Sequence, residues 1–133
     1  MEIVKHAESE KLTLNIGYVD LGKIDLLVRD GFYSNRSDFI RTAIRNQLST
    51  QAADVERSVT RNTFDLGLRD FSRAELEEVL RRKETLSIKV VGLARIAADV
   101  PPELAAATID TITVLGALQA SEAVKSALAG KLK

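Results

Sequence analysis

The sequence predicts an α+β chain in which a short strand and two helices precede a β/α repeat region. Residues 11–16 alternate between polar and apolar side chains, and the next segment carries apolar residues at helical spacing. From Thr63 onward, a strand-then-helix pattern recurs every 24 residues, starting at positions 63, 87 and 111. We therefore expect three parts: a polar arm (1–10), a strand–helix–helix domain with an extended second helix (11–61) and a three-unit repeat domain (62–133).

The composition is that of a globular protein and narrows the function classes. The chain has 133 residues, no cysteine, and 19 basic against 19 acidic side chains. The absence of cysteine excludes disulfides and thiolate chemistry and fits a reducing cytoplasm. No apolar stretch approaches the about 18 residues that a membrane span needs, so we expect no membrane partner. Zero net charge excludes a uniformly basic coat, although basic groups gathered on one face of a neutral protein remain compatible with DNA binding.

The predicted strand has one apolar and one polar face. Leu12, Leu14 and Ile16 point one way, whereas Lys11, Thr13 and Asn15 point the other way. No second strand follows within hairpin reach, so the backbone of this strand needs a partner elsewhere.

Two helices follow the strand. The first spans residues 19–30 and ends at Gly31, a residue that favours helix termination. Ser34 is the N-cap candidate of the second helix, whose apolar stripe continues to about Arg61. This segment has too little core to fold alone, which predicts a homodimer in which two strands form an antiparallel ribbon.

The repeat region aligns three similar segments. Thr63–Leu66 matches Ser87–Val90 and Thr111–Val114, and each copy closes with an apolar i, i+4 pair. In this alignment Gly92 and Gly116 correspond to Leu68 of the first copy. Strands separated by short helices favour parallel pairing with right-handed crossovers. The region is thus predicted to be a miniature β/α solenoid.

The order of these elements resembles the ribbon-helix-helix family of DNA-binding proteins, of which MetJ, Arc and CopG are the type set. The most specific part is the run Tyr33-Ser-Asn-Arg-Ser-Asp-Phe-Ile-Arg41, placed the right distance after an alternating strand. The resemblance covers about residues 11–50 and does not extend to the repeat region. Where family members often open the first helix with proline, this chain has Gly17-Tyr-Val-Asp20.

The resemblance implies a division of labour along the strand. The outward side chains Lys11, Thr13 and Asn15 would read bases, because a two-stranded ribbon fits the major groove of B-DNA. The start of the second helix, Ser34, Asn35, Arg36 and Ser37, would hold a phosphate, with Arg36 adding positive charge. The dimer core would comprise Leu12, Leu14, Ile16, Ile24, Leu27, Phe39, Ile40 and Ile44.

Other chemistry has little support in the sequence. His6 is the single histidine and lies in the polar arm, so no metal site, cofactor or enzymatic activity is expected. Arg81-Arg82-Lys83 forms a short basic run, but cations at a helix end are also favoured by the helix dipole.

The sequence favours a homodimeric, sequence-specific transcriptional regulator, most often a repressor, whose partner is double-stranded DNA. Two alternatives stay open. One is an antitoxin of a toxin–antitoxin pair, although such tails are typically disordered until they wrap a toxin. The other is an assembly protein that acts through the C-terminal repeats, because open sheet edges invite self-association or a protein partner.

Overall fold

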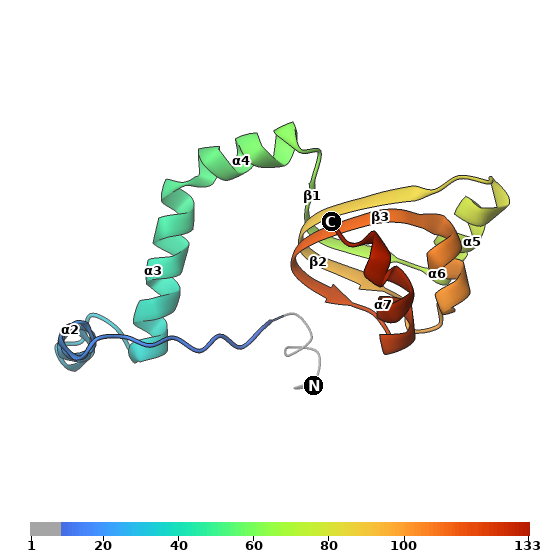
Figure 1. Cartoon of the computed structure of the whole chain (residues 1–133). Helices are drawn as coiled ribbons and strands as arrows, with labels where there is room; N and C mark the ends of the chain where they lie inside the picture. The colour runs from blue at the N-terminus through green and yellow to red at the C-terminus, as the bar shows by residue number, and fades with distance from the viewer. Residues whose placement is uncertain (1–8) are drawn as a thin grey trace. The chain divides into compact units, whose positions relative to one another are not determined.

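The structure is a computed structural model that describes residues 9–133. Residues 1–8, which make up most of the expected polar arm and include His6, lie outside the described residues. The chain divides into two units, Met1–Glu56 and Arg57–Lys133, and each is described here by itself (Figure 1). We refer to them as the N-terminal and C-terminal units.

The N-terminal unit contains two helices, α2 (Tyr18–Arg29) and α3 (Arg36–Thr50). The predicted stop at Gly31 is confirmed, since Gly31 has a φ of 87° and follows the C-cap residue Asp30. The amide of Gly31 donates to Val28 O at 3.1 Å, and the amide of Phe32 donates to Leu27 O at 3.0 Å. This double hydrogen bond is the Schellman motif, which satisfies the last carbonyls of a helix.

The second predicted helix is wrong in its continuity. Helical structure does reach Arg61, but it is split into α3 and α4 (Ala52–Arg61) at Gln51. The Gln51 amide donates to the carbonyls of Gln47 and Leu48 at 3.2 Å each, which closes α3 before the next helix begins. The sequence gave no warning of this break, because Gln51 is neither proline nor glycine.

Residues 11–16 have no regular secondary structure in the single chain and are drawn as an unpaired stretch before α2 (Figure 1). Among the described residues, no other segment pairs with them. Leu12 and Leu14 are 80% and 68% exposed. A strand with an apolar face and no partner within its own chain is what the predicted ribbon requires of each copy.

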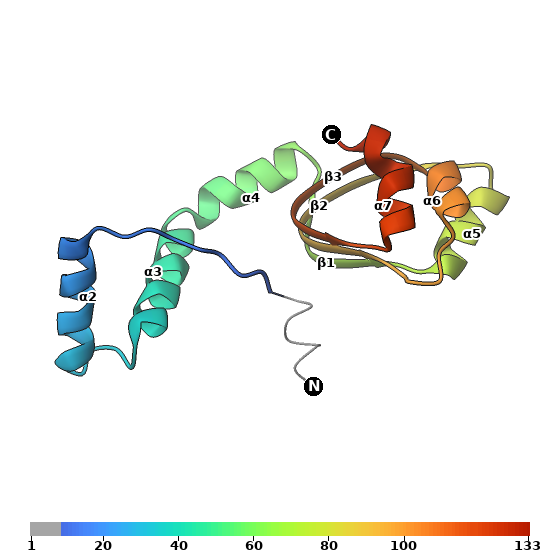
Figure 2. The ribbon, with the colours of Figure 1, turned by 60° about the horizontal axis from the view of Figure 1, so that its bottom comes forward.

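The C-terminal unit is a three-stranded parallel sheet in the order β1-β2-β3, with helices between the strands. The α+β class predicted from the sequence is therefore confirmed. Figures 1 and 2 show the three strands curving in the same sense, with the helices on the concave side. The elements are β1 (Asp65–Phe71), α5 (Arg73–Arg81), β2 (Leu86–Ile96), α6 (Pro102–Thr108), β3 (Ile109–Gln119), α7 (Glu122–Leu128) and the short 3-10 helix η1 (Ala129–Lys131).

A continuous core lies between the sheet and the helices of this unit. Ile88, Val90, Ala94 and Ile96 of β2 are buried, and their odd-numbered neighbours are half-buried or exposed. The core is completed by buried residues from every other element of the unit except η1: Phe71, Leu76, Val100, Leu104, Ala105, Ile109, Ile112, Val124 and Leu128. The C-terminal unit thus buries enough apolar surface to be stable by itself.

The register of the sheet corrects the predicted repeat. Ser87 lies beside Thr111, which is the expected step of 24 residues (111 − 87), but Leu66 lies beside Val91 rather than Val90. The first step is therefore 25 residues (91 − 66), and the partner of Gly92 in β1 is Gly67 instead of Leu68. The sequence alignment failed because it imposed one period on helical connections that differ in length by one residue.

The three aligned glycines explain how the strands bend. Gly67, Gly92 and Gly116 have φ angles of 115°, 135° and 118°, a conformation that other residues rarely adopt. A Cβ atom on Gly92 would lie 2.2 Å from Gly67 O, and one on Gly116 would lie 2.0 Å from Gly92 O. Glycine is therefore required at the second and third positions by both conformation and space.

Candidate nucleic-acid interface

The three predicted base-reading side chains lie in the stretch before α2. Lys11, Thr13 and Asn15 are all exposed. They alternate with Leu12 and Leu14, which are exposed as well, so solvent reaches both faces of this stretch in the single chain. The local sequence supplies alternation, but only a paired strand would fix the three polar side chains on one surface.

An apolar hollow of about 360 Å³ lies between this stretch and the two helices of the N-terminal unit. Its size is within the range that holds several side chains of a partner. Four of the predicted dimer-core residues line it: Leu14, Ile16, Ile24 and Ile40, together with Asn15, Tyr18, Leu21 and Arg36.

The remaining predicted dimer-core residues are only partly covered. Leu27 and Phe39 are half-buried, Ile44 is 50% exposed, and Leu12 lies largely in solvent. Ile24 is the one described residue of the N-terminal unit that is fully buried, and α3 buries none. Two well-formed helices thus carry an apolar surface that this chain does not cover.

The N-terminus of α3 has its cap one residue later than predicted. Asn35, not Ser34, is the N-cap, and its side-chain oxygen accepts a hydrogen bond of 2.8 Å from the Asp38 amide. The Asp38 carboxylate in turn accepts from the Ser34 amide at 2.9 Å. This reciprocal arrangement resembles a capping box and leaves the amides of Arg36 and Ser37 without an acceptor among the described residues. Such amides are the groups with which a helix N-terminus holds an anion.

The predicted role of Arg36 as an added positive charge needs correction. Its guanidinium forms a two-point ion pair with Asp25 of α2, through contacts of 2.8 and 2.9 Å. The hydrogen bond from Arg36 and the nearby positive charge lower the pKa of Asp25 below its ordinary value. Arg36 therefore ties α2 to the start of α3, and Asp25 offsets much of its charge. Nothing in the sequence signals this pair, because it depends on how the two helices pack.

Aromatic packing fixes the entry to α3. The rings of Tyr33 and Phe39 meet edge to face, with centroids 5.0 Å apart and an interplanar angle of 82°. A contact between a residue just before a helix and one in its first turns sets the direction in which the chain enters. This contact and the Asn35 cap together hold the predicted phosphate-binding residues in place.

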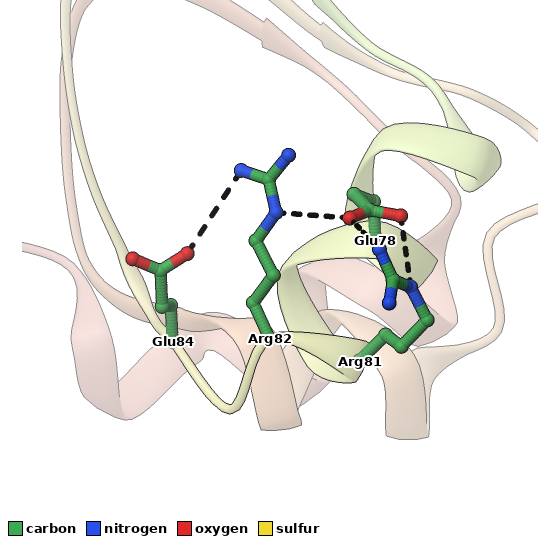
Figure 3. Close-up of polar contacts among 4 residues, drawn as sticks. All are labelled: Glu78, Arg81, Arg82 and Glu84. Atoms are coloured by element: carbon green, nitrogen blue, oxygen red, sulfur yellow. Dashed lines mark hydrogen bonds and ion pairs between the residues drawn. The ribbon is translucent and has the colours of Figure 1, made fainter.

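The basic run at the end of α5 is part of an ion-pair cluster. Arg81 and Arg82 both donate to the Glu78 carboxylate, and the pKa of Glu78 is lowered first by the hydrogen bond from Arg81 (Figure 3). Arg82 also lies 4.0 Å from a carboxylate oxygen of Glu84. Because acidic side chains match both arginines, this run is a poor candidate for a phosphate-binding patch.

Searches of the described residues for other kinds of site gave two findings. No group of three or more potential metal-ligating side chains occurs among residues 9–133. In the same part of the chain, every helix is too short or too polar to span a bilayer.

Comparisons with known proteins identify the family. No curated protein and no solved structure matches the chain. A sequence model described as the ribbon-helix-helix transcriptional regulator family matches residues 7–125. The match therefore extends well past the segment that carries the resemblance and includes most of the C-terminal unit. On this evidence of sequence over most of its length, the chain belongs to the ribbon-helix-helix family of transcriptional regulators.

Proposed function

We propose that this protein is a homodimeric, sequence-specific DNA-binding regulator, acting as a repressor from the N-terminal unit. The observation that carries the proposal is the apolar surface left uncovered around Leu12, Leu14 and Ile44, beside two capped helices. Exposed apolar area on this scale marks an interaction surface. Family membership in a group of transcriptional regulators identifies the occupant as a second copy.

In the proposed dimer, the strands 11–16 of two copies pair antiparallel. Leu12, Leu14 and Ile16 then face the helices and fill the hollow beside Ile24 and Ile40. The same pairing gathers Lys11, Thr13 and Asn15 of both copies on the opposite surface. One strand pair thereby accounts for both the apolar and the polar positions of the stretch.

The polar surface suits the base edges of the major groove. Lysine donates to guanine O6 and N7, asparagine pairs with adenine N6 and N7, and threonine contacts a polar edge or a thymine methyl group. Each good base contact contributes roughly 1–3 kcal/mol of discrimination. The ribbon would therefore set sequence preference.

The start of α3 supplies the proposed phosphate contact. The amides of Arg36 and Ser37 point away from the helix and carry the positive end of its dipole. Ser34 and Asn35 flank them, with Asn35 holding the helix end in shape through its cap. The contribution of Arg36 is reduced by Asp25, so we assign most of the phosphate contact to the backbone.

The decisive experiment is selection of DNA from a random pool at a stated salt concentration, because affinity for DNA depends steeply on salt. A palindrome with two half-sites is expected from a twofold dimer. The variant Lys11→Ala/Thr13→Ala/Asn15→Ala should lose specific binding yet remain dimeric in sedimentation. A matched control, Lys89→Ala/Thr113→Ala/Gln119→Ala, removes similar groups from the C-terminal unit and should bind normally. Undiminished sequence selection by the first variant would refute the base-reading role.

The antitoxin alternative is less well supported. An antitoxin tail is typically disordered before it binds its toxin. The core of the C-terminal unit, with Leu76, Ile112 and Leu128 fully buried, favours a folded domain. Limited proteolysis separates the two ideas, since an antitoxin should lose everything after about residue 61 quickly, whereas the proposed regulator should retain it.

A further inference from the structure

The first strand of the C-terminal sheet leaves one edge unpaired. β1 pairs with β2 on one side only, whereas β2 pairs with a strand on both sides. Residues 65–68 are all exposed, and Leu66 and Leu68 are 65% and 48% exposed. An uncovered edge of this kind is a template for another strand.

The opposite edge of the sheet is partly occupied by the chain itself. Leu132 forms a parallel bridge with Ile112 of β3, and the Lys133 amide donates to Ile112 O at 2.9 Å. Lys131 Nζ also donates to Ile109 O at 2.7 Å. Copies of the chain therefore cannot stack head to tail, with β1 of one against β3 of the next, without displacing these residues.

The backbone of β1 presents unpaired groups to the open edge. The carbonyl of Gly67 lies against Gly92, and that of Phe71 accepts from the Ala97 amide, so both face the β2 side. Successive residues of a strand direct their backbone groups to opposite edges. The amides and carbonyls of Leu66 and Leu68 consequently point outward.

Charges do not guard this stretch of the edge. Charged side chains often protect edge strands from pairing. Here the two charged residues that follow it are held within the chain, since Arg69 contacts Glu75 at 2.9 Å and Asp70 contacts Arg95 at 2.8 Å. Between them and Asp65 lie only Leu66, Gly67 and Leu68.

The bend at the glycine row restricts what can pair with β1. β2 has the same bend at Gly92 and is paired along both edges there without a shift of register, so the bend itself permits pairing. A straight strand would separate from β1 on one side of Gly67. A second copy of β1 has the matching bend, and rotation by half a turn about the bisector of the bend reverses its direction while preserving its curvature.

We infer that β1 is a self-pairing edge, at which two copies of this chain join their sheets antiparallel about a twofold axis at Gly67. Leu66 of one copy then lies opposite Leu68 of the second copy, and two three-stranded sheets become one. A twofold contact uses the same surface on both copies and closes at the dimer. The inference rests on the proposed function in one respect: paired N-terminal units would hold the two β1 strands at a high effective concentration.

The absence of native cysteine makes a disulfide test specific. The full-length variant Leu66→Cys/Leu68→Cys, oxidised at low protein concentration, should run as a covalent dimer on a non-reducing gel. The matched control Leu115→Cys/Ala117→Cys occupies the same two rows of the same sheet face, on β3 instead of β1. It should remain largely monomeric on the gel. Equal cross-linking of both variants, or none at β1, would overturn the inference.

Hydrogen exchange of the unmodified protein gives a second test. Pairing at β1 should slow exchange of the outward Leu66 and Leu68 amides at least about tenfold relative to a Leu66→Lys/Leu68→Lys variant. If β1 instead receives a peptide of another protein, these amides will exchange freely in the purified chain and the idea fails. DNA selection reports on the N-terminal unit and the disulfide reports on β1, so either proposal can fail while the other stands.

Discussion

The two units of this chain solve the same problem of burying apolar side chains in different ways. The C-terminal unit encloses Leu76, Ile112 and Leu128 completely within one chain. The N-terminal unit buries only Ile24 among its described residues and leaves Leu12 and Leu14 largely in solvent. Secondary structure is equally regular in both, so well-formed helices are no measure of a complete core. The difference teaches that the C-terminal unit can fold alone, whereas the N-terminal unit needs a second copy.

The largest expected effect is on the self-contained unit. Gly92→Ala places a Cβ atom against Gly67 O and imposes a strained φ, which together should cost roughly 3–5 kcal/mol of unfolding free energy. Gly67→Ala is the matched control, because it has a similar φ but meets no atom within 4 Å. Urea denaturation should rank the two variants in this order at any protein concentration. Equal losses would mean that the close approach of the strands is not what limits this position.

The next effect is on the dependent unit. Leu14→Lys puts a charge into the proposed dimer core and should weaken self-association of the N-terminal units roughly 100-fold or more. Sedimentation of the variant over a range of concentrations, with the DNA-binding affinity measured in parallel, tests this. The control Leu115→Lys replaces an exposed leucine of the C-terminal unit and should leave DNA binding unchanged. A Leu14→Lys variant that binds DNA normally would contradict the claim that the N-terminal unit depends on a partner.

A smaller effect concerns the ion pair within the N-terminal unit. Asp25→Asn releases Arg36 from its partner, which should raise DNA affinity several-fold and steepen its salt dependence by up to about one unit of slope. Asp70→Asn releases Arg95 from Asp70 in the other unit and serves as the control. Unchanged salt dependence after Asp25→Asn would show that Arg36 does not approach a phosphate.

The smallest effect is the titration of Asp25 itself. Arg36 lowers the pKa of this carboxyl, so its NMR midpoint should lie below the ordinary value of 3.8. The sign follows from linkage: the stabilising contribution is complete above 3.8 and is lost as the pH falls through the lower, folded-state pKa. Arg36→Ala should move the midpoint back upward, and an unmoved midpoint would contradict the pairing.

Local patterns predicted much of the fold. Alternation, helical spacing and the Gly31 stop signal depend on residues close in sequence, and the stop is found where expected. The order of the elements also indicated the family before any comparison. These features are legible because each is decided within a few residues.

Features that depend on contacts between distant residues could not be predicted. The Asp25–Arg36 pair joins two helices, the interruption at Gln51 has no breaker residue, and the partner of Gly92 depends on the length of a helical connection. In the last case the alignment chose Leu68, one residue away from the true position, Gly67. Sequence similarity alone cannot distinguish two neighbouring positions, whereas the requirement for a bare Cα next to a carbonyl does.

The row of three glycines also limits how this domain can be changed in length. Each strand must keep its glycine level with that of its neighbour, because a displaced register would set a side chain against a carbonyl oxygen. A residue inserted into a strand should therefore be tolerated poorly, while the connection between β1 and β2 is already one residue longer than that between β2 and β3. Lengthening this domain by design would mean duplicating a whole coil, from one glycine to the next.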